Sequence, residues 1–277
     1  MKKKQSPKIV VIFGVSGECG KWFKVFFEDR GYVIKGVDIT TSLTRRLRLV
    51  RLADIVVFAV PITKIVEVMM EVISESHERQ VWVNTTSEQI PAIEVMKDVR
   101  SECISFRVMT SFSQAKKLNG EKVLICFERL SIWRKTVDHW FEIMQASVER
   151  ISAELNDAYF PVVTKGSRIF SRLELDFIVR WKVNPLLLNR LATKHFAHKF
   201  GVLARVAEQN PELDADLMLG NPQETLRILD IIQTGLQTLR EKIVDEDREG
   251  IIGYLVSTRK FFPKQILKEA SQRIEDK

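Results

Sequence analysis

Cysteine is scarce in this chain of 277 residues, which contains only Cys19, Cys103 and Cys126. An odd and widely scattered set of three offers no disulfide framework and none of the close spacings of metal-binding cysteines. We therefore expect no metal and no disulfide-stabilised secreted fold. The reducing cytoplasm is the expected location.

Long apolar runs are also missing. The longest, residues 9–15 and 55–61, have the length of buried strands, whereas a membrane-spanning helix needs about 20 apolar residues. The lysines at positions 2–4 precede the first run much as in a signal peptide, but glycines interrupt the run and no small-residue cleavage site follows it. We expect a basic tail that leads into a first strand, and no membrane partner.

An acidic excess is absent as well, because Lys and Arg outnumber Asp and Glu by 43 to 36, a formal net charge of +7. A basic chain can bind nucleic acid, an anionic membrane or a small anionic substrate. Here the basic residues are spread along the sequence, and the densest group, residues 45–51, alternates with leucines as on a solvated helix face. We expect a small anionic substrate and no nucleic acid.

Short apolar runs alternate with amphipathic stretches in the first half of the chain. The run Ile9–Phe13 is apolar throughout and rich in β-branched residues, a pattern typical of a strand buried on both faces. Similar runs predict strands at residues 8–13, 32–37, 55–60, 81–83, 103–106 and 122–127, with helices at 19–30, 44–52, 62–76, 90–98 and 132–146. This alternation predicts an α/β Rossmann domain with a doubly wound, mainly parallel sheet, which we assign to residues 1–152.

After residue 152 the strand-like runs end, and long segments with a 3.6-residue period follow. They predict helices at about 154–180, 185–209, 222–246 and 248–271. The sequence Asn221-Pro222-Gln223-Glu224 predicts a helix start, because Asn can cap and Pro suits the first helical position. Several faces are apolar over a wide arc, so we expect residues 153–277 to form an all-helical domain that pairs with a second copy in a homodimer.

A glycine-rich turn follows the first expected strand and opens the first expected helix. A pyrophosphate needs backbone N–H groups and the positive end of a helix, with no side chains where backbone and phosphate meet. Gly14 permits the tight turn, Gly17 the close approach and Gly20 the packing of helix on strand. Asp38 lies 18 residues after the last glycine, where an acid can accept hydrogen bonds from an adenosine ribose. The residues expected to bind a dinucleotide in this region are Gly14, Ser16, Gly17, Cys19, Gly20 and Asp38.

The glycine spacing differs from the common G-x-G-x-x-G, which leaves the choice of nucleotide open. Asp38 favours NAD, whereas Thr40, Thr41 and Arg45 can tolerate a 2′-phosphate. An ordinary turn without a ligand is one alternative, and an atypical short-chain reductase, which has this glycine spacing, is another. None of the three tyrosines has a lysine four residues later, as the usual catalytic pair of that class requires. We predict NAD as the cofactor and keep NADP as the alternative.

Three segments resemble the prephenate dehydrogenases of tyrosine biosynthesis. Residues 12–20 are similar to that family's G-G-x-G-x-M-G loop, and residues 53–61 resemble its A-D-x-V-x-x-x-V-P strand. Residues 200–217 resemble the helix end R-L-F-A-Q-D-P-x-L-Y-A-D-I of the family's helical domain. The resemblance covers nearly the whole chain, without the chorismate mutase segment that is fused to some members.

The resemblance implies NAD- or NADP-dependent oxidative decarboxylation of prephenate to 4-hydroxyphenylpyruvate. Hydride leaves the ring carbon that bears the hydroxyl, and the ring carboxylate departs as carbon dioxide. The resemblance places Val60 and Pro61 on the nicotinamide side of the cofactor, and Arg205 on a substrate carboxylate, which a bidentate guanidinium suits. Ser87 falls on the serine of the family's D-x-x-S-x-K segment, which helps orient the ring hydroxyl, although an N-cap role is an equal alternative for this residue alone.

The family's catalytic histidine, however, is replaced. It lies in a segment H-P-M-F-G-P, and here residues 107–112 read R-V-M-T-S-F, so that Arg107 occupies the histidine position. Arginine stays protonated and cannot take a proton from the ring hydroxyl, but it can bind an anion or polarise an oxygen. The Asp and Lys of D-x-x-S-x-K are likewise replaced, by Asn84 and Gln89.

Three explanations stay open. The chain oxidises prephenate with water or another residue as the base; or it acts on an analogue such as 4-amino-4-deoxyprephenate; or it binds dinucleotide and partner without turnover. His198 lies seven residues before Arg205 on the same helix face, although a lone helical histidine is more often structural. We adopt the enzyme interpretation, with Ser87 and Arg107 as catalytic residues and Arg205 and His198 as substrate-binding residues.

Overall fold

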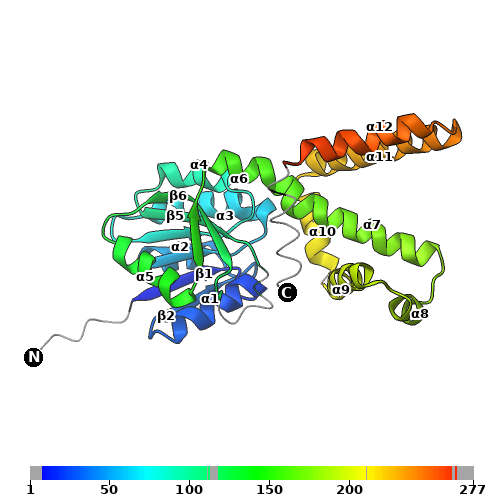
Figure 1. The fold of residues 1–277 in the computed structure, drawn as a ribbon. Coiled ribbons are helices and arrows are strands. Elements are labelled where there is room, and N and C mark those ends of the chain that lie inside the picture. Colours follow the sequence, from blue (N-terminus) through cyan, green and yellow to red (C-terminus); the bar gives the residue numbers. More distant parts are fainter. Residues whose placement is uncertain (1–7, 111, 113–117, 210, 264–265, 267–277) are drawn as a thin grey trace, which may run out of the picture. The chain divides into compact units, whose positions relative to one another are not determined.

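Seven strands form one sheet in the first of the chain's two compact units. The computed structural model describes residues 8–110, 112, 118–209, 211–263 and 266, and the two units are Met1–Gly220 and Asn221–Lys277. The strand order is β2-β1-β3-β4-β5-β6-β7; β1 to β5 are parallel, β6 is antiparallel to β5, and β7 is parallel to β6. Figure 1 shows the sheet, with β1, β2, β5 and β6 labelled. The bounds are β1 Ile9–Phe13, β2 Val33–Val37, β3 Ile55–Phe58, β4 Val81–Asn84, β5 Glu102–Val108, β6 Lys122–Arg129 and β7 Ser147–Arg150. The predicted doubly wound, mainly parallel sheet is confirmed.

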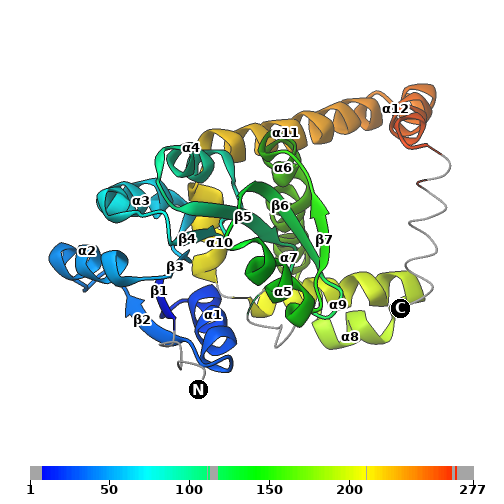
Figure 2. The ribbon, with the colours of Figure 1, turned by 90° about the vertical axis from the view of Figure 1, so that its left-hand side faces the viewer.

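Helices cover both faces of this sheet (Figure 2). α1 and α5 contribute to the core on one face, and α2, α3 and α4 to the core on the other. The bounds are α1 Glu18–Glu28, α2 Leu43–Leu52, α3 Ile65–Val72, α4 Ile90–Asp98 and α5 Arg134–Met144, with 3-10 turns η1 Ile62–Lys64 and η2 Ile73–Glu75 on either side of α3. The helix predicted over residues 62–76 is therefore three shorter helical pieces.

The position of β1 explains why its sequence is apolar throughout. Val10 and Ile12 belong to the core shared with α1 and α5, and Val11 and Phe13 belong to the core on the opposite face. Burial on both faces removes the alternation of apolar and polar residues that a half-exposed strand shows. The glycine turn follows directly after Phe13, so the sheet core holds it at the edge where the parallel strands end.

Every element that the structure describes after β7 is a helix. α6 (Ala153–Phe160), the π-helical segment η3 (Pro161–Gly166) and α7 (Ser167–Arg180) follow one another without a break. α6 packs against α4 and β6, and α7 packs along α9. π-helical turns are rare and often occur at functional sites, because they displace side chains from the regular helical spacing.

Some elements differ from the expectation. The single helix predicted over residues 185–209 is wrong: the chain forms α8 (Pro185–Arg190) and α9 (Lys194–Glu208), and the hydroxyl of Thr193 caps α9 by accepting a hydrogen bond from the N–H of Phe196 at 3.2 Å. α10 (Pro211–Leu219) was not predicted. β7 was missed because all four of its residues are exposed, so no apolar run marks it.

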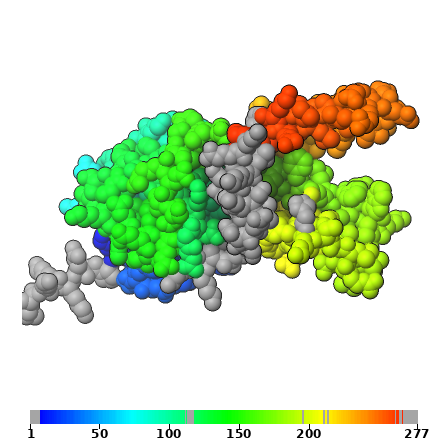
Figure 3. All heavy atoms as spheres, in the orientation of Figure 1, coloured from blue at the N-terminus to red at the C-terminus, as the bar shows by residue number. Residues whose placement is uncertain are grey.

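The second unit contains a helical hairpin of α11 (Pro222–Val244) and α12 (Arg248–Phe261). The Oδ1 atom of Asn221 accepts a hydrogen bond from the N–H of Glu224 at 3.2 Å, so the predicted cap is confirmed. The hairpin, orange in Figure 3, leaves several large apolar side chains exposed, among them Leu226, Ile231, Leu236 and Ile243.

The domain division that we predict at residue 152 stays a prediction. Strands give way to helices between Arg150 and Ala153, whereas the compact units divide after Gly220. No helix in the described part of the chain has the length and apolar character that a bilayer span requires.

Candidate functional site

The glycine turn lies where the carboxyl end of β1 meets α1. Gly14 has a φ of +77°, and a Cβ there would lie 2.3 Å from the carbonyl oxygen of Ala59; a Cβ on Gly20 would lie 2.0 Å from the carbonyl oxygen of Gly14. The packing of the turn itself therefore requires both glycines. Gly17 differs, because its Cβ would meet no neighbouring atom closer than 3.4 Å. Close approach of a ligand explains a glycine at this position better than the protein's own packing does.

The start of α1 carries no side-chain cap. Gly17 is the N-cap residue and has no side chain to offer the first-turn N–H groups. These N–H groups and the positive end of the helix dipole favour an anion. Glu18, in the first turn, is exposed to solvent. The geometry of this turn fits the pyrophosphate of a dinucleotide.

Asp38 follows β2 directly and lies beside the turn. Its carboxylate accepts hydrogen bonds from the hydroxyl and the N–H of Ser16, at 2.5 and 3.5 Å. Its own N–H donates to the hydroxyl of Thr41 at 3.1 Å. Arg45 is exposed, and the guanidinium of Arg46 is paired with Glu71. The carboxylate at this position can accept hydrogen bonds from ribose hydroxyls, whereas a 2′-phosphate would be repelled by it.

Three loops meet at this edge of the sheet. The N–H of Ala59 donates to the carbonyl oxygen of Phe13 at 2.9 Å, so Val60 and Pro61, which follow it, lie next to the turn. The Sγ atom of Cys19 lies 3.4 Å from the hydroxyl oxygen of Thr85, in the loop after β4. Burial raises the pKa of the Cys19 thiol to about 12, so the thiol is neutral near pH 7. The residues predicted to bind the cofactor are thus brought together.

In the loop after β4, the two replaced positions of the family segment join a neutral hydrogen-bonded chain. The Nδ2 atom of Asn84 donates to the hydroxyl of Ser105 at 2.8 Å, and that hydroxyl donates to the Oε1 atom of Gln89 at 2.5 Å. The Nε2 atom of Gln89 donates to the carbonyl oxygen of Thr86, and the N–H of Thr86 donates to the Oδ1 atom of Asn84 at 3.3 Å. All four side chains are buried. Asn84 and Gln89 therefore satisfy one another through Ser105, as buried polar groups must.

α6 fixes the same loop from a distant part of the sequence. The carboxylate of Asp157 accepts hydrogen bonds from the N–H groups of Gln89 and Ile90 at 2.8 and 2.9 Å. The Nδ2 atom of Asn156 donates to the carbonyl oxygen of Ser87 at 2.9 Å, while its Oδ1 atom is buried with no hydrogen-bond partner in the described structure. The N-cap alternative for Ser87 is wrong, because Gln89 is the N-cap residue of α4 and Asp157 binds the helix start.

Arg107 lies near the carboxyl end of β5 and is only 7% exposed. Its guanidinium donates a hydrogen bond to the hydroxyl of Thr164 and lies 4.5 Å from the centre of the Phe160 ring. No carboxylate of the described residues forms an ion pair with it. Burial lowers the pKa of the Arg107 guanidinium, opposed by weaker influences of Cys126 and Asp157. Arginine nonetheless stays protonated, so this is a buried cation without a counterion, an arrangement that costs folding free energy.

Lys165 is a second buried cation, and its sequence context does not distinguish it from other helical lysines. It is 0% exposed, and its Nζ atom lies 3.8 Å from the Oε1 atom of Glu88 and 5.8 Å from the centre of the Phe160 ring. Thr164 and Lys165 are consecutive residues of η3. In the sequence, Pro161 interrupts a helical pattern and so indicates an irregular helical turn close to Lys165. We refer to Glu88, Arg107, Phe160, Thr164 and Lys165 as the Arg107 cluster.

The two predicted substrate-binding residues, His198 and Arg205, both lie on α9. His198 and Arg205 are both exposed, and among the described residues no hydrogen bond or ion pair joins either side chain to the cluster. α7 and α10 are joined by the buried Asp214, which pairs with Arg168 and Arg172 at 2.6 and 2.5 Å. The roles of His198 and Arg205 stay predictions.

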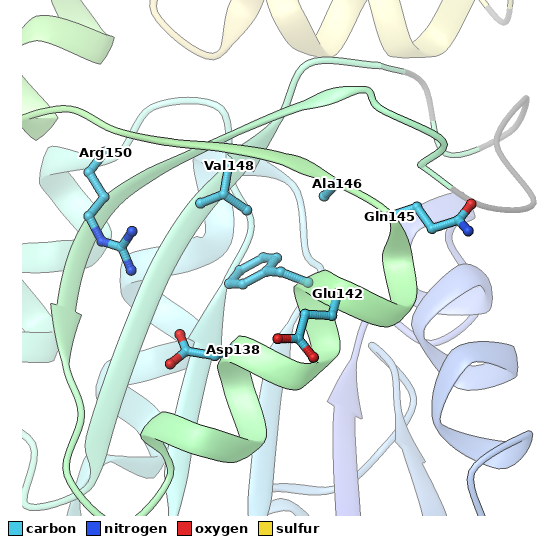
Figure 4. Close-up of a pocket in the computed structure, with 7 residues that line it drawn as sticks. Asp138, Glu142, Gln145, Ala146, Val148 and Arg150 are labelled. Atoms are coloured by element: carbon cyan, nitrogen blue, oxygen red, sulfur yellow. The ribbon is translucent and has the colours of Figure 1, made fainter.

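Two surface hollows beside α5 contain none of the predicted site residues. Figure 4 shows the first, where Asp138 and Glu142 of α5 face the β7 side chains Val148 and Arg150. The second lies near the start of β2 and is lined by Arg30, Tyr32, Lys135, Thr136, His139, Trp140 and Ile143. Over the residues that the structure describes, no group of His, Cys, Asp and Glu is arranged to hold a metal ion.

Comparisons with known proteins give a consistent result. Residues 176–257 match the model of the prephenate dehydrogenase dimerization domain. A probable arogenate/prephenate dehydrogenase of Methanocaldococcus jannaschii is 23% identical over 282 residues; the match covers 94% of this chain, and the chain spans 62% of that protein's length.

Solved structures of similar fold point the same way. A prephenate dehydrogenase of Aquifex aeolicus, in complex with hydroxyphenyl propionate and NAD+, is 20% identical, with 93% of this chain and 98% of that chain covered and a TM-score of 0.63. An arogenate dehydrogenase of Synechocystis is 16% identical, with 91% and 97% covered and a TM-score of 0.58. At these identities the structures establish the fold alone.

Proposed function

We propose that this chain, which belongs to the prephenate dehydrogenase family, uses NAD or NADP to oxidise prephenate or a close cyclic relative. One observation carries the proposal: the glycine turn and the Arg107 cluster both lie at the carboxyl end of the parallel strands of one sheet. In open α/β sheets, ligands bind at this edge. The Aquifex aeolicus structure, solved with NAD+ and hydroxyphenyl propionate, supports the pairing of a dinucleotide with an aromatic acid.

The residues at the turn fit a dinucleotide. We assign the pyrophosphate to the uncapped start of α1 and to Gly17, where the protein leaves room for close approach. We assign the adenosine ribose to Asp38, whose negative charge favours NAD over NADP. Val60 and Pro61 border the nicotinamide side. The bound cofactor supplies the hydride acceptor.

The substrate roles fall to polar residues of both halves of the chain. Ser87, held by Asn156, orients the ring hydroxyl. Arg205 binds a substrate carboxylate, with His198 on the same helix as a further contact. Arg107 cannot accept a proton, so its contribution is the binding of a negatively charged group.

A homodimer completes this proposal. Residues 176–257 match a dimerization domain, and large apolar side chains of this region are exposed in the single chain, including Trp181 at 71% and Leu186 at 84%. Exposed apolar surface of this extent is typical of subunit interfaces. We propose that residues 153–277 form the dimerising helical domain of a cytoplasmic enzyme. A monomer mass in solution would contradict this.

The replaced positions bear on the alternatives. Asn84 and Gln89, which occupy the replaced positions, are joined through Ser105, as the buried polar groups of any folded chain must be. The altered residues therefore direct attention to substrates other than prephenate. Arogenate and 4-amino-4-deoxyprephenate are the alternative substrates, because both keep the cyclic acid and differ in an amino group.

An ultraviolet assay for reduced nicotinamide tests the proposal. Purified protein is incubated with prephenate, arogenate or 4-amino-4-deoxyprephenate, each with NAD and NADP in parallel. Arg205→Ala is the matched control, because the residue is exposed and its loss leaves the core intact. We expect NADH formation with at least one cyclic acid and a large loss in the control. Cofactor binding without turnover of any of the three acids would overturn the enzyme assignment.

A further inference from the structure

The Arg107 cluster places two buried cations around one aromatic ring. The guanidinium of Arg107 lies 4.5 Å, and the ammonium of Lys165 5.8 Å, from the centre of the Phe160 ring. Arg107 lies on β5 and Lys165 on η3. The two cations therefore come together only when the sheet and the helical segment α6-η3-α7 are both folded.

The two cations differ in their counterions. Lys165 faces the carboxylate of Glu88 at 3.8 Å. Arg107 has only the neutral hydroxyl of Thr164 and the face of Phe160, and no ion pair with any described residue. An arginine that is 93% buried without a counterion destabilises the fold unless an anion completes it. A guanidinium held against an aromatic ring is thus preorganised for a negatively charged ligand atom.

We propose that Arg107, supported by the charge of Lys165, forms an oxyanion site that binds the substrate's ring oxygen as it becomes negatively charged, in place of a side chain that accepts its proton. This inference rests on the proposed function and assigns a role to Arg107, which stands at the position of the family's catalytic histidine. Donors fixed where charge develops stabilise a transition state without needing to titrate.

The chemical step balances without a protein base. The hydroxyl proton passes to water, and the resulting alkoxide is held by the Arg107 guanidinium. Hydride moves from the carbon that bears this oxygen to the nicotinamide, which is reduced while the ring is oxidised. The bond to the ring carboxylate then breaks, carbon dioxide leaves, and its electron pair makes the ring aromatic, with a phenolate oxygen that regains a proton from water.

The remaining charged and titratable groups near Arg107 do not replace this role. Asp157 is engaged by the N–H groups of Gln89 and Ile90. Burial raises the pKa of the Cys126 thiol to about 12, so it is neutral near pH 7. Glu88 lies beside Lys165. Arg107 is therefore the group in this cluster that lacks a counterion.

A chromophoric phenol tests the proposal in the full-length protein. The probe is 3-(4-hydroxy-3-nitrophenyl)propionate, a nitro derivative of the ligand seen in the Aquifex aeolicus structure, whose phenolate absorbs visible light. In the presence of NAD+, we expect the pKa of the bound phenol to fall by about one unit or more, a tenfold shift toward the phenolate. Arg107→Met should abolish the shift, Arg107→Lys should keep part of it, and Lys165→Met should reduce it.

Controls separate the oxyanion site from folding and from binding. Arg107→Lys keeps a cation on β5, so a shift retained there and lost in Arg107→Met follows the charge, and a cooperative urea transition of Arg107→Met shows that this variant is folded. Arg205→Ala should weaken probe affinity without changing the pKa of the bound phenol. An unshifted phenol, or an equal shift in Arg107→Met, overturns the proposal. If the protein turns over a cyclic acid but does not bind the probe, the oxyanion site is overturned and the proposed function stands. If it neither binds the probe nor turns over any cyclic acid, the proposed function is overturned as well.

Discussion

Replacement of Arg107 by methionine should make the protein more stable. The guanidinium is buried, burial lowers its pKa, and its partners are one hydroxyl and one aromatic face. Replacing a buried charge by an apolar side chain of similar volume is commonly neutral or stabilising by roughly 1–4 kcal/mol. Because Arg107 has no counterion to leave behind, we expect a gain of about 1–3 kcal/mol in the free energy of unfolding. The cost is the lost hydrogen bond to Thr164, worth about 1 kcal/mol.

Arg129, an exposed residue at the end of the neighbouring strand β6, is a contrasting case. Its guanidinium donates to four backbone carbonyl groups, those of Met96, Lys97, Val99 and Ser101. Arg129→Met should therefore destabilise the fold by about 2 kcal/mol or more, because charged hydrogen bonds are lost and carbonyl groups are left without partners.

Urea unfolding of the wild type and of both variants measures these differences from the transition midpoints, provided that the slopes agree. If Arg107→Met instead lowered the free energy of unfolding by more than about 1 kcal/mol, the guanidinium would stabilise the fold, contrary to this prediction. A gain in stability accompanied by lost turnover would mark Arg107 as a residue kept for function at the expense of stability.

Three further predictions concern the turn, the loop and the thiols. Gly17→Ala should leave the unfolding midpoint nearly unchanged but weaken NAD binding, whereas Gly14→Ala should destabilise by about 2 kcal/mol or more because of its positive φ and the short contact; equal thermal shifts would contradict this. Asp157→Ala should cost about 1–2 kcal/mol by freeing the start of α4, and should raise KM through the Ser87 loop; an unchanged melting temperature would argue against it. Burial raises the pKa of all three thiols to about 12, so they should react slowly with a disulfide reagent near pH 8 until the protein unfolds. Because the folded thiols ionise later than unfolded ones, stability should decline as pH rises above about 8.5, and a flat profile from there to about pH 10 would count against the burial.

The sheet and its turn could be predicted because their constraints are local in sequence. β1 is buried on both faces, which demands an apolar side chain at every position, and Gly14 follows it because only glycine tolerates that backbone so close to Ala59. Both demands are visible within about ten residues. β7 escaped prediction for the converse reason: a short exposed edge strand makes no such demand on its side chains.

The Arg107 cluster could be predicted only in part. Arg107 itself was found as a departure from a motif, but its surroundings come from η3, far along the chain. Lys165 has the appearance of any helical lysine, and nothing in its neighbours shows that its side chain is buried. The role of Asp157 was hidden in the same way, because a helix normally takes its cap from its own first residues, whereas α4 takes it from α6.

The fate of one hydrogen atom decides whether the protein transfers hydride from a cyclic acid to NAD+. Prephenate carrying deuterium on the carbon that bears the hydroxyl would be incubated with the protein and NAD+, and the nucleotide would be analysed by mass spectrometry; the other two cyclic acids, labelled at the carbon that loses hydride, would follow. With the wild-type protein we predict deuterium in the nicotinamide ring of the reduced cofactor. With Arg107→Met we predict that no deuterium is transferred to the cofactor. Bound NAD+ that never acquires deuterium from any of the three acids would contradict the proposed hydride transfer.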